Sequence, residues 1–177
     1  LQLSRIGSVA NTLEQVDVGQ LAKEAVALVA GQIDARGVEV VIAPDLPSVF
    51  GDHSRLLRVL QNLLDNAVKY MGDQAAPKIE IGVLPETSDE PVFFVRDNGD
   101  GIDPRYHRKV FGLFEQLDSR NEGTGMGLTM IRRIIEVHGG RIWVESEGEG
   151  QGATFFFSLP SSSLSATGHV RLLESSA

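Results

Sequence analysis

The chain has 177 residues, of which 42% are hydrophobic and 23% charged, so its composition is that of an ordinary folded domain. Its 24 acidic and 16 basic residues give a formal net charge of −8, which argues against nucleic-acid binding because such a surface repels phosphates. It contains no cysteine, which excludes disulfides, thiolate zinc sites and thiol nucleophiles.

Residues 1–16 carry apolar side chains at near-helical spacing that starts in mid-pattern. We expect them to form the end of an upstream helical hairpin, or a linker. Asp17, followed three residues later by Gln20, predicts a capping box and the start of a helix that continues to about Arg36. Gly37 is the expected stop signal of that helix.

Two strands are predicted next, at residues 38–43, where apolar and polar residues alternate, and at residues 48–50, after proline-containing turns. Asp52 is a typical helix-capping residue, and a long helix is expected at about 53–70. Pro77 lies beyond the end of that helix.

In the second half of the chain the patterning predicts strands at 78–84 and 92–97, a helix at about 126–138, and strands at 141–146 and 153–159. Residues 104–122 show weak periodicity, which predicts a short helix and a mobile loop, and the serine-rich residues 161–177 predict a flexible tail. Because hairpins outnumber strand–helix–strand crossovers, we expect an α+β fold. Its sheet should be mixed but mostly antiparallel, with about three helices on one face.

The long helix predicted at 53–70 has two different sides. At about 100° per residue, five leucines and Ala67 fall on one arc that suits a core. A neighbouring arc carries four polar or aromatic residues, Asn62, Asn66, Lys69 and Tyr70. An amide oxygen can ligate Mg²⁺, an ammonium group can neutralise phosphate, and a tyrosine can stack on a base. The alternative is an ordinary amphipathic helix with a solvated polar flank.

A second cluster is the sequence DNGDGID at residues 97–103, directly after an apolar strand. A carboxylate at the end of a strand can accept a hydrogen bond from a ligand amine, and glycines allow the backbone to approach the ligand closely. The alternative is a simple turn, since Asp-Asn-Gly forms turns readily.

A third cluster, GTGMGL at residues 123–128, opens a predicted helix. Backbone N–H groups at such a helix start can bind an anion. The alternative is a flexible hinge, because this pattern is neither a Walker loop nor a dinucleotide fingerprint.

The fourth cluster, FGLFEQ at residues 111–116, places two phenylalanines in a polar setting. They must pack against another part of the protein, either when a loop closes or as a small satellite of the core.

Together and in this order, the four clusters resemble the Bergerat-type ATP-binding domain of sensor histidine kinases, gyrase, mismatch-repair proteins and heat-shock chaperones. The sequences NLLDNAVKY, DNGDGI, VFGLFEQ and GTGMGLTMIRRIIEVHGGRIWVES are most similar to the catalytic domain of bacterial two-component histidine kinases. The resemblance covers residues 17–160 and implies a two-layer α/β sandwich that binds ATP and Mg²⁺. Residues 1–16 would then precede the domain, and residues 161–177 would follow it.

The resemblance also implies roles for individual residues. Asn66 would hold Mg²⁺ against the triphosphate, and Lys69 would reach the phosphates. Tyr70 would lie along the adenine, and Asp97 would accept a hydrogen bond from its amino group. The other nucleotide-binding positions would be Asn62, Gly99, Gly101, Ile102, Phe111, Phe114, Gly123, Thr124, Gly125, Met126, Gly127 and Leu128. Among these, Gly99 and Gly101 would make room for the base, the glycines at 123, 125 and 127 would cradle phosphate, and the two phenylalanines would pack the lid formed by 104–122.

Asn62 favours phosphoryl transfer over hydrolysis. The hydrolytic relatives resemble one another in carrying a water-activating glutamate at this position, and an amide cannot act as a general base near neutral pH. The acceptor expected in this family is a histidine followed by an acidic residue, but the residues that follow histidines 53, 107, 138 and 169 are Ser, Arg, Gly and Val. We therefore expect no catalytic acceptor in this chain, and an acceptor histidine on an upstream helical hairpin.

The expected protein is thus a histidine kinase whose catalytic domain works with the phosphoacceptor hairpin of the same protein and with a response regulator receiver domain. The full-length protein would be a homodimer. This chain should be cytoplasmic, without contact to nucleic acid or membrane, within a protein that is either cytoplasmic or membrane-tethered. Two alternatives remain open: a serine kinase of the anti-sigma type, and a nucleotide-binding regulatory module without transfer activity.

Overall fold

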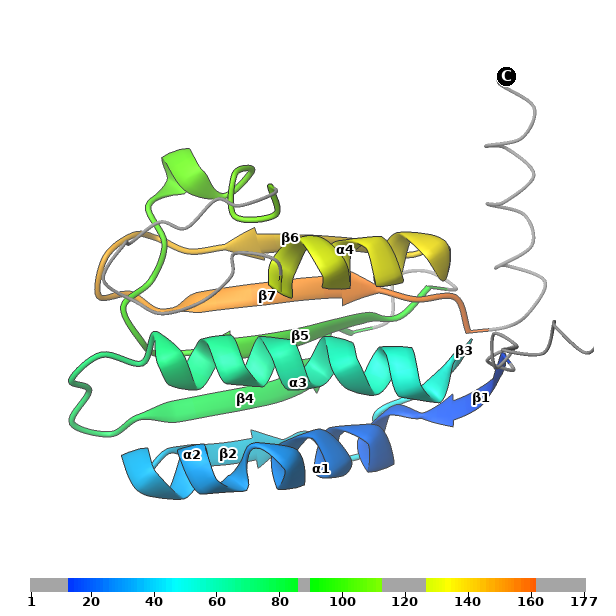
Figure 1. Ribbon diagram of the computed structural model, residues 1–177, viewed down its shortest axis with the longest axis horizontal. Coiled ribbons are helices and arrows are strands. Elements are labelled where there is room, and N and C mark those ends of the chain that lie inside the picture. Colours follow the sequence, from blue (N-terminus) through cyan, green and yellow to red (C-terminus); the bar gives the residue numbers. More distant parts are fainter. Residues whose placement is uncertain (1–12, 86–89, 113–126, 162–177) are drawn as a thin grey trace, which may run out of the picture.

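The computed structural model describes residues 13–85, 90–112 and 127–161, which form two layers, with helices packed on one face of a five-stranded sheet (Figure 1). The strand order is β2-β4-β5-β7-β6. The strands are β2 (Glu39–Ile42), β4 (Lys78–Val83), β5 (Val92–Asp97), β6 (Arg141–Glu145) and β7 (Ala153–Ser158). β2 and β4 pair in parallel, and the other three pairs are antiparallel. The predicted α+β fold with a mostly antiparallel sheet is confirmed.

Within the described residues, four helices cover this sheet: α1 (Val18–Leu28), α2 (Ala30–Arg36), α3 (His53–Lys69) and α4 (Gly127–Val137). The sequence predicted a single helix for the region that forms α1 and α2. That helix breaks at Val29, which has a non-helical backbone (φ −108°, ψ 10°) and a side chain that is only 1% exposed. The bend lets Val29 enter the core. In the part of the chain that the structure describes, no helix is long and apolar enough to cross a membrane.

A small second sheet was missed by the sequence analysis. β1 (Glu14–Asp17) pairs antiparallel with β3 (Ser48–Gly51). The expectation of a helix end at residues 1–16 is therefore wrong for residues 14–16, where buried Val16 lies between exposed neighbours, as in a half-buried strand. Residues 1–12 lie outside the described ranges.

Both predicted helix caps are present. The Asp17 carboxylate accepts a hydrogen bond from the backbone N–H of Gln20 (2.9 Å), and the Asp52 carboxylate accepts one from the N–H of Arg55 (3.0 Å). The first cap is only half of the predicted capping box, because the Gln20 side chain bonds Glu24 instead of returning to the cap residue.

The apolar side of α3 fills the space between the sheet and the other helices. Its buried residues are Leu56, Val59, Leu60, Leu63, Leu64, Ala67 and Val68. Burying a side chain of this size stabilises a fold by about 1.5–3 kcal/mol relative to leaving it exposed. This packing fixes the rotation of α3 about its axis, so the polar side of the helix is held along the edge of the core.

Candidate functional site

The polar side of α3 faces the start of α4. Asn62 donates a hydrogen bond from its amide to the carbonyl of Arg58 (2.9 Å). Its amide oxygen would lie only 2.8 Å from a Cβ added at Gly127, the first residue of α4. Glycine at this position therefore lets α4 begin directly against the polar side of α3. Two predicted clusters, far apart in the sequence, meet here.

Further along α3, Asn66 and Lys69 follow Asn62 at intervals of four and three residues, which places them on the same side of the helix. Asn66 is partly exposed, and no described residue hydrogen-bonds to its side chain. Lys69 lies with its ammonium group 5.1 Å from the centre of the Tyr70 ring, and Tyr70 is 37% exposed. An amide, an ammonium group and an aromatic ring are thus gathered at the C-terminal end of α3.

Asp97 ends β5, and its carboxylate is largely buried. Its Oδ1 atom accepts hydrogen bonds from the backbone N–H groups of Gly99 (2.9 Å) and Ala153 (3.2 Å). Burial raises the pKa of Asp97 to about 6, although these two hydrogen bonds act in the opposite direction. Among the described residues nothing donates to Oδ2, so this oxygen is available to accept a hydrogen bond from a ligand.

The loop after β5 packs directly on the end of α3. The N–H of Asp100 donates to the carbonyl of Tyr70 (2.8 Å), and a Cβ added at Gly99 would overlap that same carbonyl oxygen. Gly101 has a φ of +73°, and a Cβ there would overlap the carbonyl oxygen of Gly148. No other residue type fits these two positions without moving the backbone.

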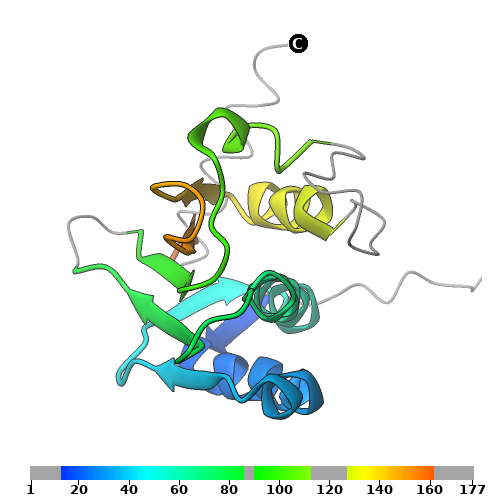
Figure 2. The same ribbon diagram turned by 90° about the vertical axis from the view of Figure 1, so that its left-hand side faces the viewer.

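The loop between β6 and β7 packs against the same site, although the sequence pattern predicted only the strands on either side of it. Gly150 donates its N–H to Asp100 (2.6 Å), and Gly152 donates to Gly99 (3.0 Å). In Figure 2, a view along α3, the segment after β5 (green) passes the end of α3 toward α4, with the loop between β6 and β7 (orange) nearby. Richness in glycine was the only signal in the sequence that this loop had a tightly packed neighbour.

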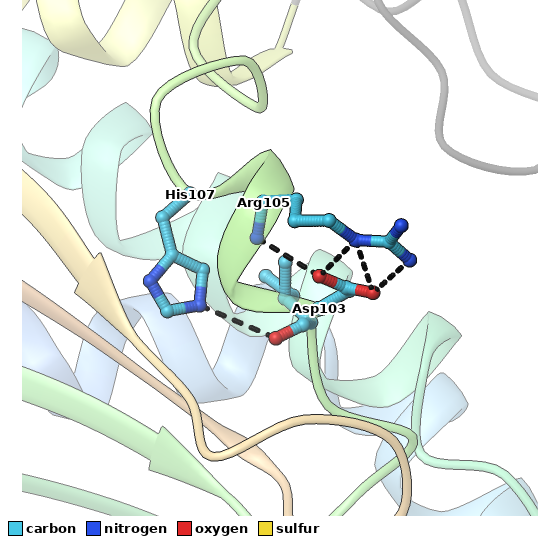
Figure 3. Close-up of polar contacts among 4 residues, drawn as sticks. Asp103, Arg105 and His107 are labelled. Carbon is cyan, nitrogen blue, oxygen red and sulfur yellow. Dashed lines mark hydrogen bonds and ion pairs between the residues drawn. The ribbon is translucent and has the colours of Figure 1, made fainter.

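The segment that leaves the site begins with a 3-10 helix, η1 (Pro104–Tyr106), in line with the short helix predicted there. Asp103 caps η1 through the N–H of Arg105 (2.9 Å) and forms an ion pair with the guanidinium group of the same arginine (Figure 3). Arg105 holds the pKa of Asp103 at about 2, and the pair is exposed to solvent. A ring nitrogen of His107 lies 3.2 Å from the carbonyl oxygen of Ile102. Local contacts therefore fix the start of this segment.

The segment is anchored again at Phe111, which is 6% exposed and packs edge-on against Phe155, with ring centres 6.1 Å apart. The hydroxyl of Thr129 on α4 donates to the carbonyls of Phe111 (3.2 Å) and Gly112 (2.9 Å). Phe111 is therefore part of the main hydrophobic core rather than of a separate satellite cluster. Contact between Phe111 and a nucleotide stays a prediction.

The remaining predicted positions divide into two groups. Ile102 and Leu128 are partly buried against the core. The other group lies outside the described residues and comprises Phe114, Gly123, Thr124, Gly125 and Met126. The structure thus brings together the described members of three clusters, on α3, after β5 and at the start of α4. Convergence with Gly125 stays a prediction.

The oxygen donors of this site limit how it could hold a metal ion. In the described part of the chain, no three His, Cys, Asp or Glu side chains are grouped so that they could hold an ion. Mg²⁺ commonly takes one or two protein oxygens and completes its shell with water and phosphate oxygens of a substrate. The unbonded amide of Asn66 supplies one such oxygen, so the residues fit an ion that arrives with phosphates.

Comparison with curated proteins finds relatives among sensor kinases. The chain is 51% identical over 160 residues to the methanogenesis regulatory histidine kinase FilI of Methanothrix harundinacea, a match that covers 90% of this chain and 18% of FilI. It is 39% identical over 162 residues to cyanobacterial phytochrome B of Nostoc, covering 90% of this chain and 21% of the phytochrome. The chain therefore spans about a fifth of the length of these relatives.

Solved structures of histidine kinases share the fold. Full-length ShkA in complex with AMPPNP matches with a TM-score of 0.74 and 29% identity, over 87% of this chain and 32% of ShkA. The catalytic domain of ThkA matches with a TM-score of 0.73 and 28% identity, over 85% of this chain and 96% of that domain. ThkA in complex with the response regulator TrrA gives a TM-score of 0.70 and 25% identity, over 85% of this chain and 42% of that chain.

A family model described as histidine kinase-, DNA gyrase B- and HSP90-like ATPase matches residues 51–163. These residues run from the end of β3 to just beyond β7 and include every described position of the site. The chain belongs to the family of histidine kinase-, DNA gyrase B- and HSP90-like ATPases.

Proposed function

We propose that this domain binds Mg·ATP and transfers the γ-phosphoryl group to a histidine on a helical hairpin that precedes it in the full-length protein. The observation that carries the proposal is the meeting of the Asp97 loop with the amide- and ammonium-bearing end of α3. A largely buried carboxylate, in a loop that packs on the helix end carrying Tyr70, suits a base that carries an amino group. The similarity to histidine kinases, one of them crystallised with AMPPNP, supports the same function.

In this proposal Asp97 accepts a hydrogen bond from the adenine amino group through Oδ2, while the Tyr70 ring lies along the base. Gly99 and Gly101 keep side chains out of the space that the base occupies. The phosphates extend toward Lys69 and the start of α4, where backbone N–H groups and the helix dipole favour negative charge. The glycines at 123 and 125 are proposed to complete that cradle.

Asn66 is the residue that we propose to hold Mg²⁺, through its amide oxygen. When bound, the ion offsets the charge of the phosphates and orients them. We expect Asn66→Ala to abolish the dependence of ATP affinity on Mg²⁺ in calorimetric titrations with and without the ion. Asn66→Asp is the matched control, because it retains an oxygen ligand and should preserve the dependence. An unchanged Mg²⁺ dependence in Asn66→Ala would place the ion elsewhere.

Asn62 supports transfer over hydrolysis. Its amide donates to the carbonyl of Arg58 and cannot take a proton from water near neutral pH. A site without a general base at this position should hydrolyse ATP slowly and keep the γ-phosphoryl group for another acceptor. Positioning and charge neutralisation are then sufficient for phosphoryl transfer.

The proposed partners are the phosphoacceptor hairpin of the same protein, as a homodimer, and a response regulator receiver domain. The decisive experiment mixes the 177-residue chain with a separately purified hairpin fragment and γ-labelled ATP. Acid-labile, alkali-stable label on the hairpin is the expected result, and a hairpin whose acceptor histidine is replaced by glutamine should stay unlabelled. Acid-stable label on a protein serine would indicate a serine kinase instead. Tight ATP binding without any transfer would indicate a regulatory module.

A further inference from the structure

Ser146 lies immediately after β6, and its hydroxyl group joins two loops. Its Oγ atom accepts hydrogen bonds from the N–H groups of Ile102 (2.9 Å) and Gly148 (3.3 Å). The hydroxyl donates to the carbonyl of Gly152 (2.6 Å). A serine hydroxyl has one donor and two acceptor positions, so all of its hydrogen-bonding capacity is used here.

The loops that Ser146 joins are the two that surround Asp97, namely residues 97–102, the base loop, and residues 146–152, the hairpin loop. Gly152 is followed by Ala153, whose N–H donates to Asp97 Oδ1 (3.2 Å). A Cβ added at Gly152 would overlap the carbonyl oxygen of Asp97. A shift of Gly152 therefore displaces both the backbone of Asp97 and one of the two donors that orient its carboxylate.

On the other side, Ser146 holds Ile102, which follows Gly101 at the end of the base loop. Gly101 itself has no room to move toward Gly148. The base loop is thus held at its beginning by Gly99 and Ala153, through Asp97, and at its end by Ser146. Among the described side chains, that of Ser146 is the one that hydrogen-bonds to both loops.

We propose that Ser146 is a positioning residue for recognition of the base: it locks the hairpin loop to the base loop and so keeps Asp97 Oδ2 directed toward the ligand. This inference rests on the proposed function, since the ligand group read by Asp97 is taken to be the adenine amino group. Ser146 does not touch the nucleotide. Its effect should therefore depend on the amino group and should require Asp97.

The experiment compares two nucleotides, ATP and purine riboside triphosphate, which lacks the 6-amino group. We expect Ser146→Ala to bind ATP about five- to tenfold more weakly, because one oriented hydrogen bond to a charged acceptor is impaired. Binding of purine riboside triphosphate should change by less than about twofold. Ser146→Thr retains the hydroxyl and should restore ATP affinity. Hydrogen exchange at the Ile102 amide should accelerate in Ser146→Ala only.

Ser158→Ala is the matched control. Ser158 is fully buried, and its Oγ atom accepts a hydrogen bond from the N–H of Arg141 (3.2 Å) at the opposite end of the same hairpin. Loss of this hydrogen bond in Ser158→Ala should lower the unfolding temperature without changing the affinity for either nucleotide. If Ser146→Ala proves too unstable to titrate, Ser146→Cys provides the same loss of strong hydrogen bonds with the volume filled.

The outcomes separate this inference from the proposed function. Equal weakening of both nucleotides in Ser146→Ala, or no weakening of either, would overturn the positioning role while wild-type ATP binding stands. Additive effects in the double variant Ser146→Ala/Asp97→Asn would also overturn it, because a residue that acts through Asp97 should have little effect once Asp97 is replaced. Failure of the wild-type chain to bind ATP at all would instead count against the proposed function.

Discussion

The two ends of α3 use polar groups in opposite ways. At the N-terminal end, Asp52 (3% exposed) and His138 (5% exposed) are buried and bonded to each other: the N–H of Asp52 donates to Nε2 of His138 (3.0 Å). Because Nε2 accepts this bond, the ring carries its hydrogen on Nδ1, which donates to the carbonyl of Ile134 (2.7 Å). At the C-terminal end, Asn66 and Tyr70 are partly exposed, and the amide of Asn66 has no partner among the described residues.

This contrast separates stability from binding along a single helix. Polar groups that are bonded within the protein join α3 to α4 and contribute to the free energy of unfolding. Polar groups without internal partners contribute little to folding but remain available to a ligand. In Asp97 the two uses are combined: Oδ1 is bonded within the protein and Oδ2 is not, and the largely buried carboxylate disfavours folding in its charged form. Substitutions at the two ends should therefore change different measured quantities.

The largest expected effect is at the N-terminal end. His138→Ala should lower the free energy of unfolding by about 2–4 kcal/mol, because it leaves a cavity and unpaired buried groups on Asp52 and Ile134. Chemical denaturation measures this change, and ATP affinity of the folded fraction should be unaltered. Val137→Ala, at an exposed neighbouring position, is the control and should cost no more than about 0.5 kcal/mol. A loss of ATP affinity in folded His138→Ala would contradict the separation.

Asp97→Asn should have opposite effects on binding and stability. ATP affinity should fall by about 1.5–3 kcal/mol, because a charged acceptor becomes an amide that can present its N–H₂ group to the base. The amide oxygen can still accept the bonds from Gly99 and Ala153, so the fold loses only a buried charge. Calorimetry and thermal unfolding at pH 8 test the two effects. Unchanged ATP affinity would remove Asp97 from the base site.

The sign of the stability change follows from the pKa of Asp97. This pKa is 3.8 for an aspartate in the unfolded chain and about 6 in the folded protein. Between these pH values the unfolded chain releases its proton while the folded protein keeps it, so stability falls as pH rises through this window. Asp97→Asn cannot ionise and therefore removes this pH-dependent loss of stability. Its advantage over wild type should be at most about 3 kcal/mol above pH 6 and should vanish below about pH 4.

The smallest expected effect is the pH dependence of binding by the wild-type chain. Because the pKa of Asp97 is about 6, most of this carboxyl is protonated at pH 5, and the apparent affinity for ATP should be about tenfold lower than at pH 7.5. Asp97→Asn should lack this component and retain only the effect of protonating ATP itself. Parallel pH profiles of the two proteins would show that Asp97 does not titrate in the site.

Local sequence signals predicted much of this molecule. The periodicity of apolar residues and the Asp52 cap predicted the start and end of α3 to within one residue. The arc of leucines predicted on that helix forms most of its buried face. The break at Val29 and the strand β1 were not predictable in this way. Val29 leaves the helix because the core accommodates its side chain, and β1 exists because β3 lies beside it. Both depend on neighbours that are distant in the sequence.

For the candidate site, residue type indicated ligand-binding chemistry for Asn66, Lys69 and Asp97 separately, and the resemblance to histidine kinases joined them into one nucleotide site. They left out Ser146 and the hairpin loop, whose contacts with the base loop span more than forty residues of sequence. Backbone hydrogen bonds between two glycine-rich loops carry no residue-specific pattern, so only the fold reveals them.

The sequence by itself determined most of the helices and strands, and which side chains could serve a ligand, because periodicity and residue chemistry are local properties. The tertiary structure decided which of those side chains meet. It also determined that the carboxylate of Asp97 is buried with one oxygen unbonded, and that the hydroxyl of Ser146 joins the two loops around it. Burial and contact depend on how distant segments pack, which no local pattern specifies.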